Sequence, residues 1–210
     1  MVNAVLNQEN IDTGKEIMAE LVAKFNNNKE FYTSNLFKEE EAKIEFINPM
    51  FEALGWDIHN KQCLGPNFKE VIFEESLAVG KETKAPDYSF RLGGQLIYYL
   101  EAKKPSVNIK EDRSPAFQAR RYGWSAKIPI VILTDFEEFA IYETSSKPKE
   151  HERASTNRVL YYTCDEYLDK WEEIYSLFSK EAVQKELFQK FVDDIHLKLK
   201  KVLNQLIKSF

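Results

Sequence analysis

Apolar residues recur at helical spacing in two segments near the start of the chain. Within residues 11–27, large apolar side chains fall three or four positions apart and therefore share one face of a helix. Residues 39–54 repeat this spacing, and the apolar stripe there comprises Ile44, Ile47, Met50, Phe51 and Leu54. Gly55 suits a helix C-terminus. Pro49 has no N–H to donate, so we expect a kink or a break at that position.

Short runs rich in β-branched and aromatic residues follow, which is the pattern of strands. These runs are residues 70–74, 87–92, 95–102, 128–134, 139–143 and 159–162. Gly93 and Gly94 separate the second run from the third and predict a hairpin. Residues 114–126, with Pro115 near their start, predict a helix between the third and fourth runs. Because a strand–helix–strand order favours a right-handed crossover between parallel neighbours, we expect a mixed sheet with helices on its faces.

The last third of the chain is helical by period over residues 165–178 and 182–210. We therefore expect an α/β domain, residues 1–164, followed by a helical C-terminal extension, residues 165–210. The final residues, HLKLKKVLNQLIKSF, show no helix cap and no stop signal. This pattern fits a natural terminus and the cut end of a longer protein equally well.

The composition is that of a soluble globular protein, since the 210 residues are 43% hydrophobic and 30% charged. No apolar run approaches the ~20 residues that a membrane helix needs, and the first residues lack the pattern of a secretion signal. We interpret Cys63 and Cys164 as reduced thiols in a cytoplasmic protein, and the sequence leaves a disulfide between them open. The three histidines are scattered, which supports neither a zinc site nor a histidine-based nuclease.

Charge is distributed unevenly along the chain. The net charge of -5 argues against a protein that coats nucleic acid nonspecifically. Residues 103–127 nevertheless contain seven basic residues and only two acidic ones. The basic set comprises Lys103, Lys104, Lys110, Arg113, Arg120, Arg121 and Lys127. A segment of this kind can follow a phosphate backbone locally.

The most informative stretch is APDYSFRLGGQLIYYLEAKKP, residues 85–105. Side chains two positions apart on a strand point to the same face, so Glu101 and Lys103 project together at the end of an apolar strand. Two charges at such a place are costly unless they meet a partner, a metal ion or water. Two carboxylates, here Asp87 and Glu101, can hold Mg²⁺ through oxygen. A lysine beside the ion can orient an attacking water.

The hairpin must have a particular register for Asp87 to reach Glu101. A strict two-residue turn at Gly93 and Gly94 pairs Asp87 with Leu100 and turns it to the wrong face. A three-residue turn pairs Asp87 with Tyr99 and brings it to the face of Glu101. A metal site therefore requires an odd-length turn or a β-bulge in this hairpin.

The Pro-Asp pair at 86–87 and the Glu-Ala-Lys triplet at 101–103 resemble the signature of the PD-(D/E)XK nuclease superfamily. Five segments occur in the matching order: EAKIEFINPMFEALGWD (41–57), PDYSFRL (86–92), YLEAKKP (99–105), QARRY (118–122) and PIVILTDFEEFAIYE (129–143). Together they resemble the N-terminal endonuclease domain of bifunctional type IIG restriction–modification enzymes. The related N-terminal nuclease domain of type I restriction subunits is similar. The resemblance covers roughly residues 35–205.

This resemblance implies a restriction-endonuclease-like core and a metal-dependent endodeoxyribonuclease. It implies that Asp87, Glu101 and the main-chain carbonyl of Ala102 hold Mg²⁺, for which Mn²⁺ can substitute. It makes Asp87, Glu101 and Lys103 the catalytic core. It also implies a glutamate on an upstream helix, which Glu45 matches.

Residues after the core match an accessory element of related nucleases. Gln118 and Tyr122 fit its QxxxY pattern, and their spacing places them on one helix face. Arg120 and Arg121 are the accompanying candidates for contacts with the DNA backbone. No Gly-rich methyltransferase loop and no NPPY-type tetrapeptide occurs. We therefore expect a separate or excised nuclease domain that works with specificity and methyltransferase or motor domains.

Simpler structural roles exist for each of these residues. Alone, Asp87 is more typical of a turn, and Glu101 with Lys103 is more typical of a strand-end ion pair. Glu45 and the 118–122 segment would suit a solvated helix face. The ordered set of five segments favours a nuclease that acts on double-stranded DNA, with a second copy recruited transiently for double-strand breaks. The alternative is a noncatalytic DNA-binding or assembly module with a nuclease-like fold.

Overall fold

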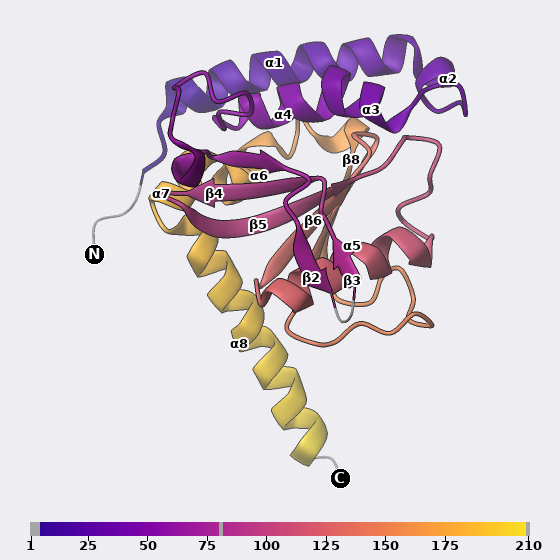
Figure 1. Cartoon of the computed structure of the whole chain (residues 1–210), viewed down its shortest axis with the longest axis vertical. Helices are drawn as coiled ribbons and strands as arrows, with labels where there is room; N and C mark the ends of the chain where they lie inside the picture. The colour runs from indigo at the N-terminus through magenta and orange to yellow at the C-terminus, as the bar shows by residue number, and fades with distance from the viewer. Residues whose placement is uncertain (1–4, 80–81, 209–210) are drawn as a thin grey trace.

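The computed structural model describes residues 5–79 and 82–208. At its centre lies a six-stranded sheet in the order β1-β4-β5-β6-β7-β8 (Figure 1). The strands are β1 Val71–Phe73, β4 Tyr88–Leu92, β5 Gln95–Ala102, β6 Ile130–Thr134, β7 Glu138–Glu143 and β8 Arg158–Thr163. β5 and β6 are parallel, whereas the other neighbouring pairs are antiparallel. The six predicted strands and the mixed sheet are therefore confirmed.

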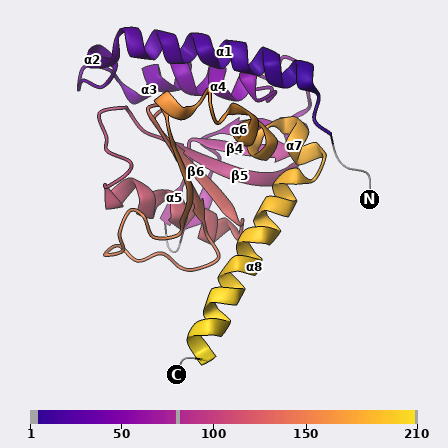
Figure 2. The same ribbon diagram turned by 180° about the vertical axis from the view of Figure 1, so that it is seen from behind.

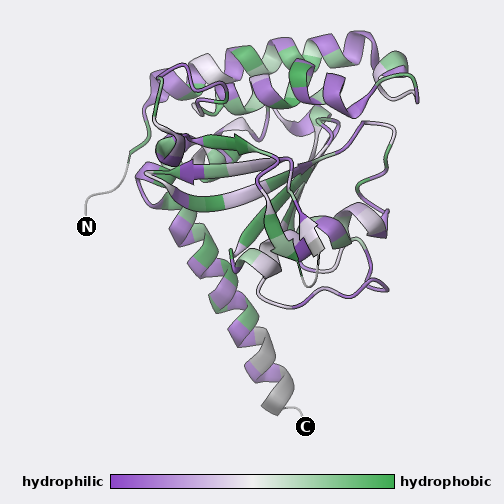
Figure 3. Cartoon of the chain, viewed as in Figure 1, coloured by the Kyte–Doolittle hydropathy of each residue, from purple (hydrophilic) through white to green (hydrophobic). Residues whose placement is uncertain are grey.

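Helices cover both faces of this sheet (Figures 1 and 2). One face is covered by α1 Gln8–Asn27, α2 Lys29–Tyr32, α3 Glu39–Ala42, the π-helical segment η1 Lys43–Ile47, and α4 Asn48–Ala53. α5, Arg113–Ala126, connects β5 to β6 and packs on the other face. Alternate residues of β6 explain this layering: Ile130 and Ile132 join the core under α1 and α4, while Val131 and Leu133 join the core under α5. All five residues of the strand are accordingly buried, and the first four are apolar; the sheet as a whole is rich in hydrophobic residues (Figure 3).

A small hairpin was not predicted from the sequence. β2 Leu77–Val79 pairs with β3 Glu82–Lys84 in a separate two-stranded sheet, and β2 packs against α5. Strands of three residues carry too little periodicity to be distinguished from a loop. Val79 fills a small core with Tyr99 and Tyr122, which ties the hairpin to the middle of the domain.

The C-terminal segment forms helices, as predicted, with breaks between them. It comprises η3 Cys164–Glu166, α6 Trp171–Phe178, α7 Lys180–Gln184 and α8 Leu187–Lys208. Residues 209–210 of the predicted helix lie outside the described part of the chain. Trp171 and Phe178 belong to the same core as α1 and α4, whereas the distal part of α8 extends away from the body (Figure 2).

The helix predicted at 39–54 is continuous but changes its winding in the middle. Pro49 cannot donate to a carbonyl in the preceding turn, and Asn48 donates its N–H to the carbonyl of Lys43 five residues earlier. The π turn shifts the face of the helix that meets the sheet. Ile44, assigned to the apolar stripe from the sequence, is 66% exposed, so that assignment is wrong, and Phe46 is buried instead.

The hairpin β4–β5 contains a β-bulge, one of the two irregularities that a metal site at Asp87 and Glu101 requires. Gly93 and Gly94 form a two-residue turn with positive φ at both positions, 57° and 83°. A β-bulge then shifts the register next to Phe90, so that Tyr88 pairs with Leu100. The predicted bulge is confirmed, and the suggested pairing of Asp87 with Tyr99 is wrong. Asp87 directly precedes Tyr88, and Glu101 directly follows Leu100. Asp87 therefore lies opposite Glu101 across the hairpin.

The structure also describes the state of the two cysteines and the length and polarity of the helices. Cys63 is exposed, Cys164 is buried, and both are free thiols. Within residues 5–79 and 82–208, every helix is too short or too polar to span a membrane.

Candidate active site

Asp87, Glu101 and Lys103 converge at the C-terminal end of β5. The main-chain N–H of Ala102 donates a 2.8 Å hydrogen bond to Oδ2 of Asp87, which holds that carboxylate against the strand. Nζ of Lys103 lies 2.6 Å from Oε1 of Glu101. The alternation of side chains along β5 turns Glu101 and Lys103 away from the core that receives Leu100. The structure thus brings together the three residues predicted to form the catalytic core.

Gln118 and Tyr122 approach this group from α5. Nε2 of Gln118 donates to Oε1 of Glu101 at 2.6 Å and to the hydroxyl of Tyr122 at 3.0 Å. α5 is fixed at its start by Asp112, whose side chain accepts the N–H of Ser114. One turn of helix separates Gln118 from Tyr122, so both face β5. The structure therefore places both residues beside Glu101, as their sequence pattern implied.

Burial gives Glu101 unusual electrostatics. The residue is 3% exposed, and its Oε2 atom has no hydrogen-bond partner. Burial first, and then the charge of Asp87, raise the pKa of Glu101 to about 7, although Lys103 opposes the shift. Burial also disfavours the charged form of Lys103, but Glu101 overcomes this effect and the pKa of Lys103 is raised. The site therefore contains a buried carboxyl group with a raised pKa and one oxygen without a hydrogen-bond partner.

A lysine from the helical layer completes the group and was not identified from the sequence. Nζ of Lys43 lies 2.6 Å from Oδ1 of Asp87, 2.7 Å from Oε1 of Glu40 and 3.8 Å from Oε1 of Glu39. Burial raises the pKa of Glu39, and Lys103 opposes this shift, so Glu39 is also within electrostatic reach of the site. The available signal was the spacing of Glu39 and Lys43, which are four residues apart and share a helix face.

Two residues predicted near the site lie elsewhere. The carboxylate of Glu45 forms an ion pair with Lys24 at 2.7 Å and is 36% exposed. The structure does not bring it to Asp87, because the π turn leaves Glu39 and Lys43 on the face toward β4. Arg120 is 2% exposed and pairs with Glu152 at 2.8 Å, so the structure does not present it at the surface as a contact for the DNA backbone. Sequence spacing alone could not separate buried Arg120 from its neighbour.

Arg121 points in a different direction from Arg120. Its guanidinium lies 5.6 Å from the centre of the Phe117 ring. Together with Gln118 and Tyr122, it lines a cavity of about 280 Å³ beneath the β2–β3 hairpin. The half-buried guanidinium of Arg121 therefore lies in the same cavity as Gln118 and Tyr122 and remains available to solvent.

The donor set can be compared with the needs of a metal ion. Within residues 5–79 and 82–208, no group of three or more His, Cys, Asp or Glu side chains could hold a metal ion. Mg²⁺, however, is commonly held by one or two carboxylates, with water and phosphate completing its shell. The buried, unpartnered Oε2 atom of Glu101 and the neighbouring Asp87 fit such a cation.

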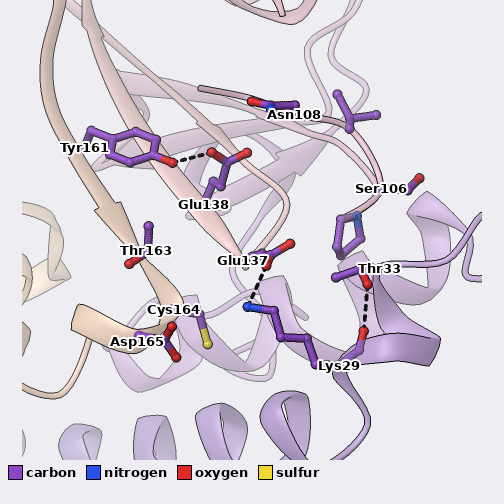
Figure 4. Close-up of a pocket in the computed structure, with 12 residues that line it drawn as sticks. Lys29, Thr33, Ser106, Asn108, Glu137, Glu138, Tyr161, Thr163, Cys164 and Asp165 are labelled. Carbon is purple, nitrogen blue, oxygen red and sulfur yellow. Dashed lines mark hydrogen bonds and ion pairs between the residues drawn. The ribbon is translucent and has the colours of Figure 1, made fainter. Parts of the chain in front are cut away.

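A larger cavity near the end of the sheet is distinct from this group. It has a volume of about 440 Å³, and its lining residues include Lys29, Glu137, Glu138 and Tyr161 (Figure 4). Lys29 pairs with Glu137 at 2.8 Å, and the hydroxyl of Tyr161 donates to Glu138. Its lining carries three carboxylates, those of Glu137, Glu138 and Asp165, against the one ammonium of Lys29, and Asp87, Glu101 and Lys103 do not line it.

A mixed sheet flanked by helices, with two carboxylates and a lysine at the end of a central strand, defines a restriction-endonuclease-like α/β fold. Residues 67–150 match the family described as type I restriction enzyme R protein N terminus. The chain is also 39% identical over 171 residues to the type II restriction enzyme and methyltransferase RM.Eco57I of Escherichia coli. The match covers 80% of this chain and 17% of that enzyme. No solved structure matches the chain.

These matches show that the chain carries a restriction-enzyme N-terminal domain, which confirms the predicted resemblance to the N-terminal domains of restriction enzymes. The chain spans only 17% of the length of its matched relative.

Proposed function

We propose that this domain is a Mg²⁺-dependent endonuclease that hydrolyses phosphodiester bonds of double-stranded DNA. The observation that carries the proposal is the buried Glu101 carboxylate beside Asp87 and Lys103, with one oxygen free of any partner. Such a group is costly in a stable fold unless it serves a ligand. The matched relative is named as a restriction enzyme, which supports the same class of reaction.

The residues of the site have separable roles in this proposal. Asp87, Glu101 and the carbonyl of Ala102 would hold the metal ion, which would acidify a water molecule and neutralise charge on the phosphate. Gln118 fixes the orientation of Glu101, and the N–H of Ala102 fixes that of Asp87. Lys103 orients the attacking water and supplies positive charge near the phosphate.

The overall reaction is a simple hydrolysis. The oxygen of the water forms a bond to phosphorus, and the bond from phosphorus to one deoxyribose oxygen breaks. A proton from the water ends on that leaving oxygen. One site of this kind cuts one strand at a time, so a double-strand break requires either a second copy of the domain or two successive binding events. Sequence recognition and methylation belong to other domains of the same chain or complex in this proposal.

Metal-dependent nicking of supercoiled plasmid tests the proposal. We expect nicking in Mg²⁺ or Mn²⁺, and DNA binding without turnover in Ca²⁺, because the larger Ca²⁺ coordinates more loosely. Asp87→Asn, Glu101→Gln and Lys103→Met should each abolish nicking while the circular dichroism spectrum stays unchanged. Glu137→Gln, in the separate cavity, is the matched control and should retain activity. DNA binding without nicking in any metal would favour the noncatalytic module instead.

A further inference from the structure

Lys43 occupies the side of Asp87 that faces the helical layer. Its ammonium lies 2.6 Å from Oδ1 of Asp87, and its side chain is only 10% exposed. The other oxygen of Asp87, Oδ2, accepts the N–H of Ala102 at 2.8 Å. Both oxygens of this carboxylate therefore have a donor, in contrast to Oε2 of Glu101. Lys43 therefore places a positive charge directly beside Asp87.

The position of Lys43 is fixed by the π-helical segment. Its carbonyl accepts the N–H of Asn48, and Oδ1 of Asn48 accepts the hydroxyl of Tyr88 at 2.8 Å. The two ends of the π turn thus contact two consecutive residues, Asp87 and Tyr88. Because Asn48 and Tyr88 are both buried, this second contact anchors the first.

A divalent cation bound to Asp87 would lie close to the Lys43 ammonium. Like charges at such a distance repel strongly when the surroundings are partly buried. Lys43 has another partner available, because Oε1 of Glu40 lies 2.7 Å from its Nζ atom and the Glu40 side chain is 73% exposed. The ammonium can therefore move outward with Glu40 without losing its counter-ion.

We propose that Lys43 is an internal counter-ion that competes with a divalent cation for Asp87 and so sets the metal affinity of the site. This inference rests on the proposed function and deepens it. Lys43 holds Asp87 in place before the cation arrives and withdraws toward Glu40 when it binds. The residue is a positioning residue, since it acts through Asp87.

Calorimetric titration with Ca²⁺, in the absence of DNA, tests this inference directly. Lys43→Met removes the charge but keeps the length of the side chain, and we expect it to bind Ca²⁺ about tenfold more tightly than the wild type. A purely structural role predicts the opposite, because a released Asp87 would bind the ion less well. Equal or weaker binding by a folded Lys43→Met protein would overturn the inference. Binding that does not depend on Asp87, judged by Asp87→Asn, would refute the proposed function itself.

A second pair of variants tests the withdrawal of Lys43 even if Lys43→Met fails to fold. Glu40→Gln removes the outer partner of Lys43, whereas Glu41→Gln removes the same charge from the same helix without touching Lys43. We expect Glu40→Gln to weaken Ca²⁺ binding severalfold relative to Glu41→Gln. Equal affinities in these two variants would overturn the withdrawal toward Glu40.

Discussion

The hydroxyl of Tyr88 donates a 2.8 Å hydrogen bond to the side-chain oxygen of Asn48, and both residues are buried. Tyr88 directly follows Asp87, and Asn48 directly follows the π-helical segment that begins at Lys43. This bond therefore joins the helical layer to the strand that carries the candidate metal ligand. The site depends on this connection as well as on the residues that would touch a substrate.

Tyr88→Phe should lower the free energy of unfolding by about 1–3 kcal/mol, because it leaves Oδ1 of Asn48 buried without a donor. Urea unfolding measures this change. Asn48→Leu removes the acceptor, and a double-mutant cycle of the two substitutions isolates the bond from other effects of each change. We expect a coupling energy of about 1 kcal/mol. Strictly additive effects would contradict the connection.

The raised pKa of Glu101 predicts how stability changes with pH in metal-free protein. The unfolded chain releases this proton near the ordinary value of 4.5, whereas the folded protein retains it until about pH 7. The stabilising contribution is thus complete below pH 4.5 and is lost as pH rises through 7. The loss should amount to roughly 3 kcal/mol, since one pKa unit corresponds to about 1.4 kcal/mol.

Urea unfolding in the presence of a chelator, at several pH values between 4.5 and 8, measures this loss. Glu101→Gln keeps the shape of the side chain but cannot ionise, so its stability should fall less over the same range. Parallel profiles for the two proteins would show that Glu101 does not titrate as the structure indicates.

Much of the site followed from local rules of backbone geometry. Alternation along β5 was enough to place Glu101 and Lys103 on one face, and the strand–helix–strand order was enough to make β5 and β6 parallel. The position of Asp87 could be stated only as a condition, because a β-bulge moves the register by one residue and leaves no clear mark in the sequence.

The helical side of the site was harder to predict for a different reason. A regular α-helix through 39–54 would direct Ile44 inward, but the π turn rotates the helix and exposes it. The same rotation pairs Glu45 with Lys24 and turns Lys43 toward Asp87. Pro49 indicated that the helix would be irregular near this position. Whether the irregularity would be a kink, a break or a π turn depended on tertiary contacts, about which sequence periodicity carries no information.

Glu39 and Glu45 provide a matched test of this rotation. Glu39→Gln removes a charge that lies near both Lys43 and Lys103, and we expect it to reduce plasmid nicking about tenfold, as is common for residues that support metal ligands. Glu45→Gln removes the same charge on the far side of the helix and should leave nicking unchanged. The reverse order of effects would restore Glu45 as the upstream glutamate of the site.

Arg120 and Arg121 are adjacent in sequence and should respond in opposite ways to substitution. Arg120→Ala leaves Glu152 without its buried partner and should cost about 3 kcal/mol of stability. Arg121→Ala should change stability by less than about 0.5 kcal/mol. Arg121→Ala should weaken DNA binding, because it removes a solvent-accessible guanidinium from the cavity that Gln118 and Tyr122 also line. Thermal unfolding and DNA titration of both variants measure the two effects, and a shared loss of stability would contradict the different environments of these residues.

DNA binding by this chain should be weak, independent of sequence and strongly dependent on salt. The net charge of -5 disfavours association with a polyanion. Within residues 103–127, burial removes Arg120 from the surface and the ion pair with Glu101 occupies Lys103. Five basic side chains remain for phosphate contacts: Lys104, Lys110, Arg113, Arg121 and Lys127.

If all five contact phosphates, the logarithm of the binding constant should fall with the logarithm of salt concentration with a slope no steeper than about -4.5. Titration of random duplexes across a salt series measures this slope. Lys104→Ala, next to the site, should reduce its magnitude by about one. Lys15→Ala, an exposed residue on α1, is the control and should leave it unchanged. Tight and sequence-specific binding at physiological salt would contradict this prediction, because phosphate contacts carry no sequence information and a base-reading element would then have to lie within this chain.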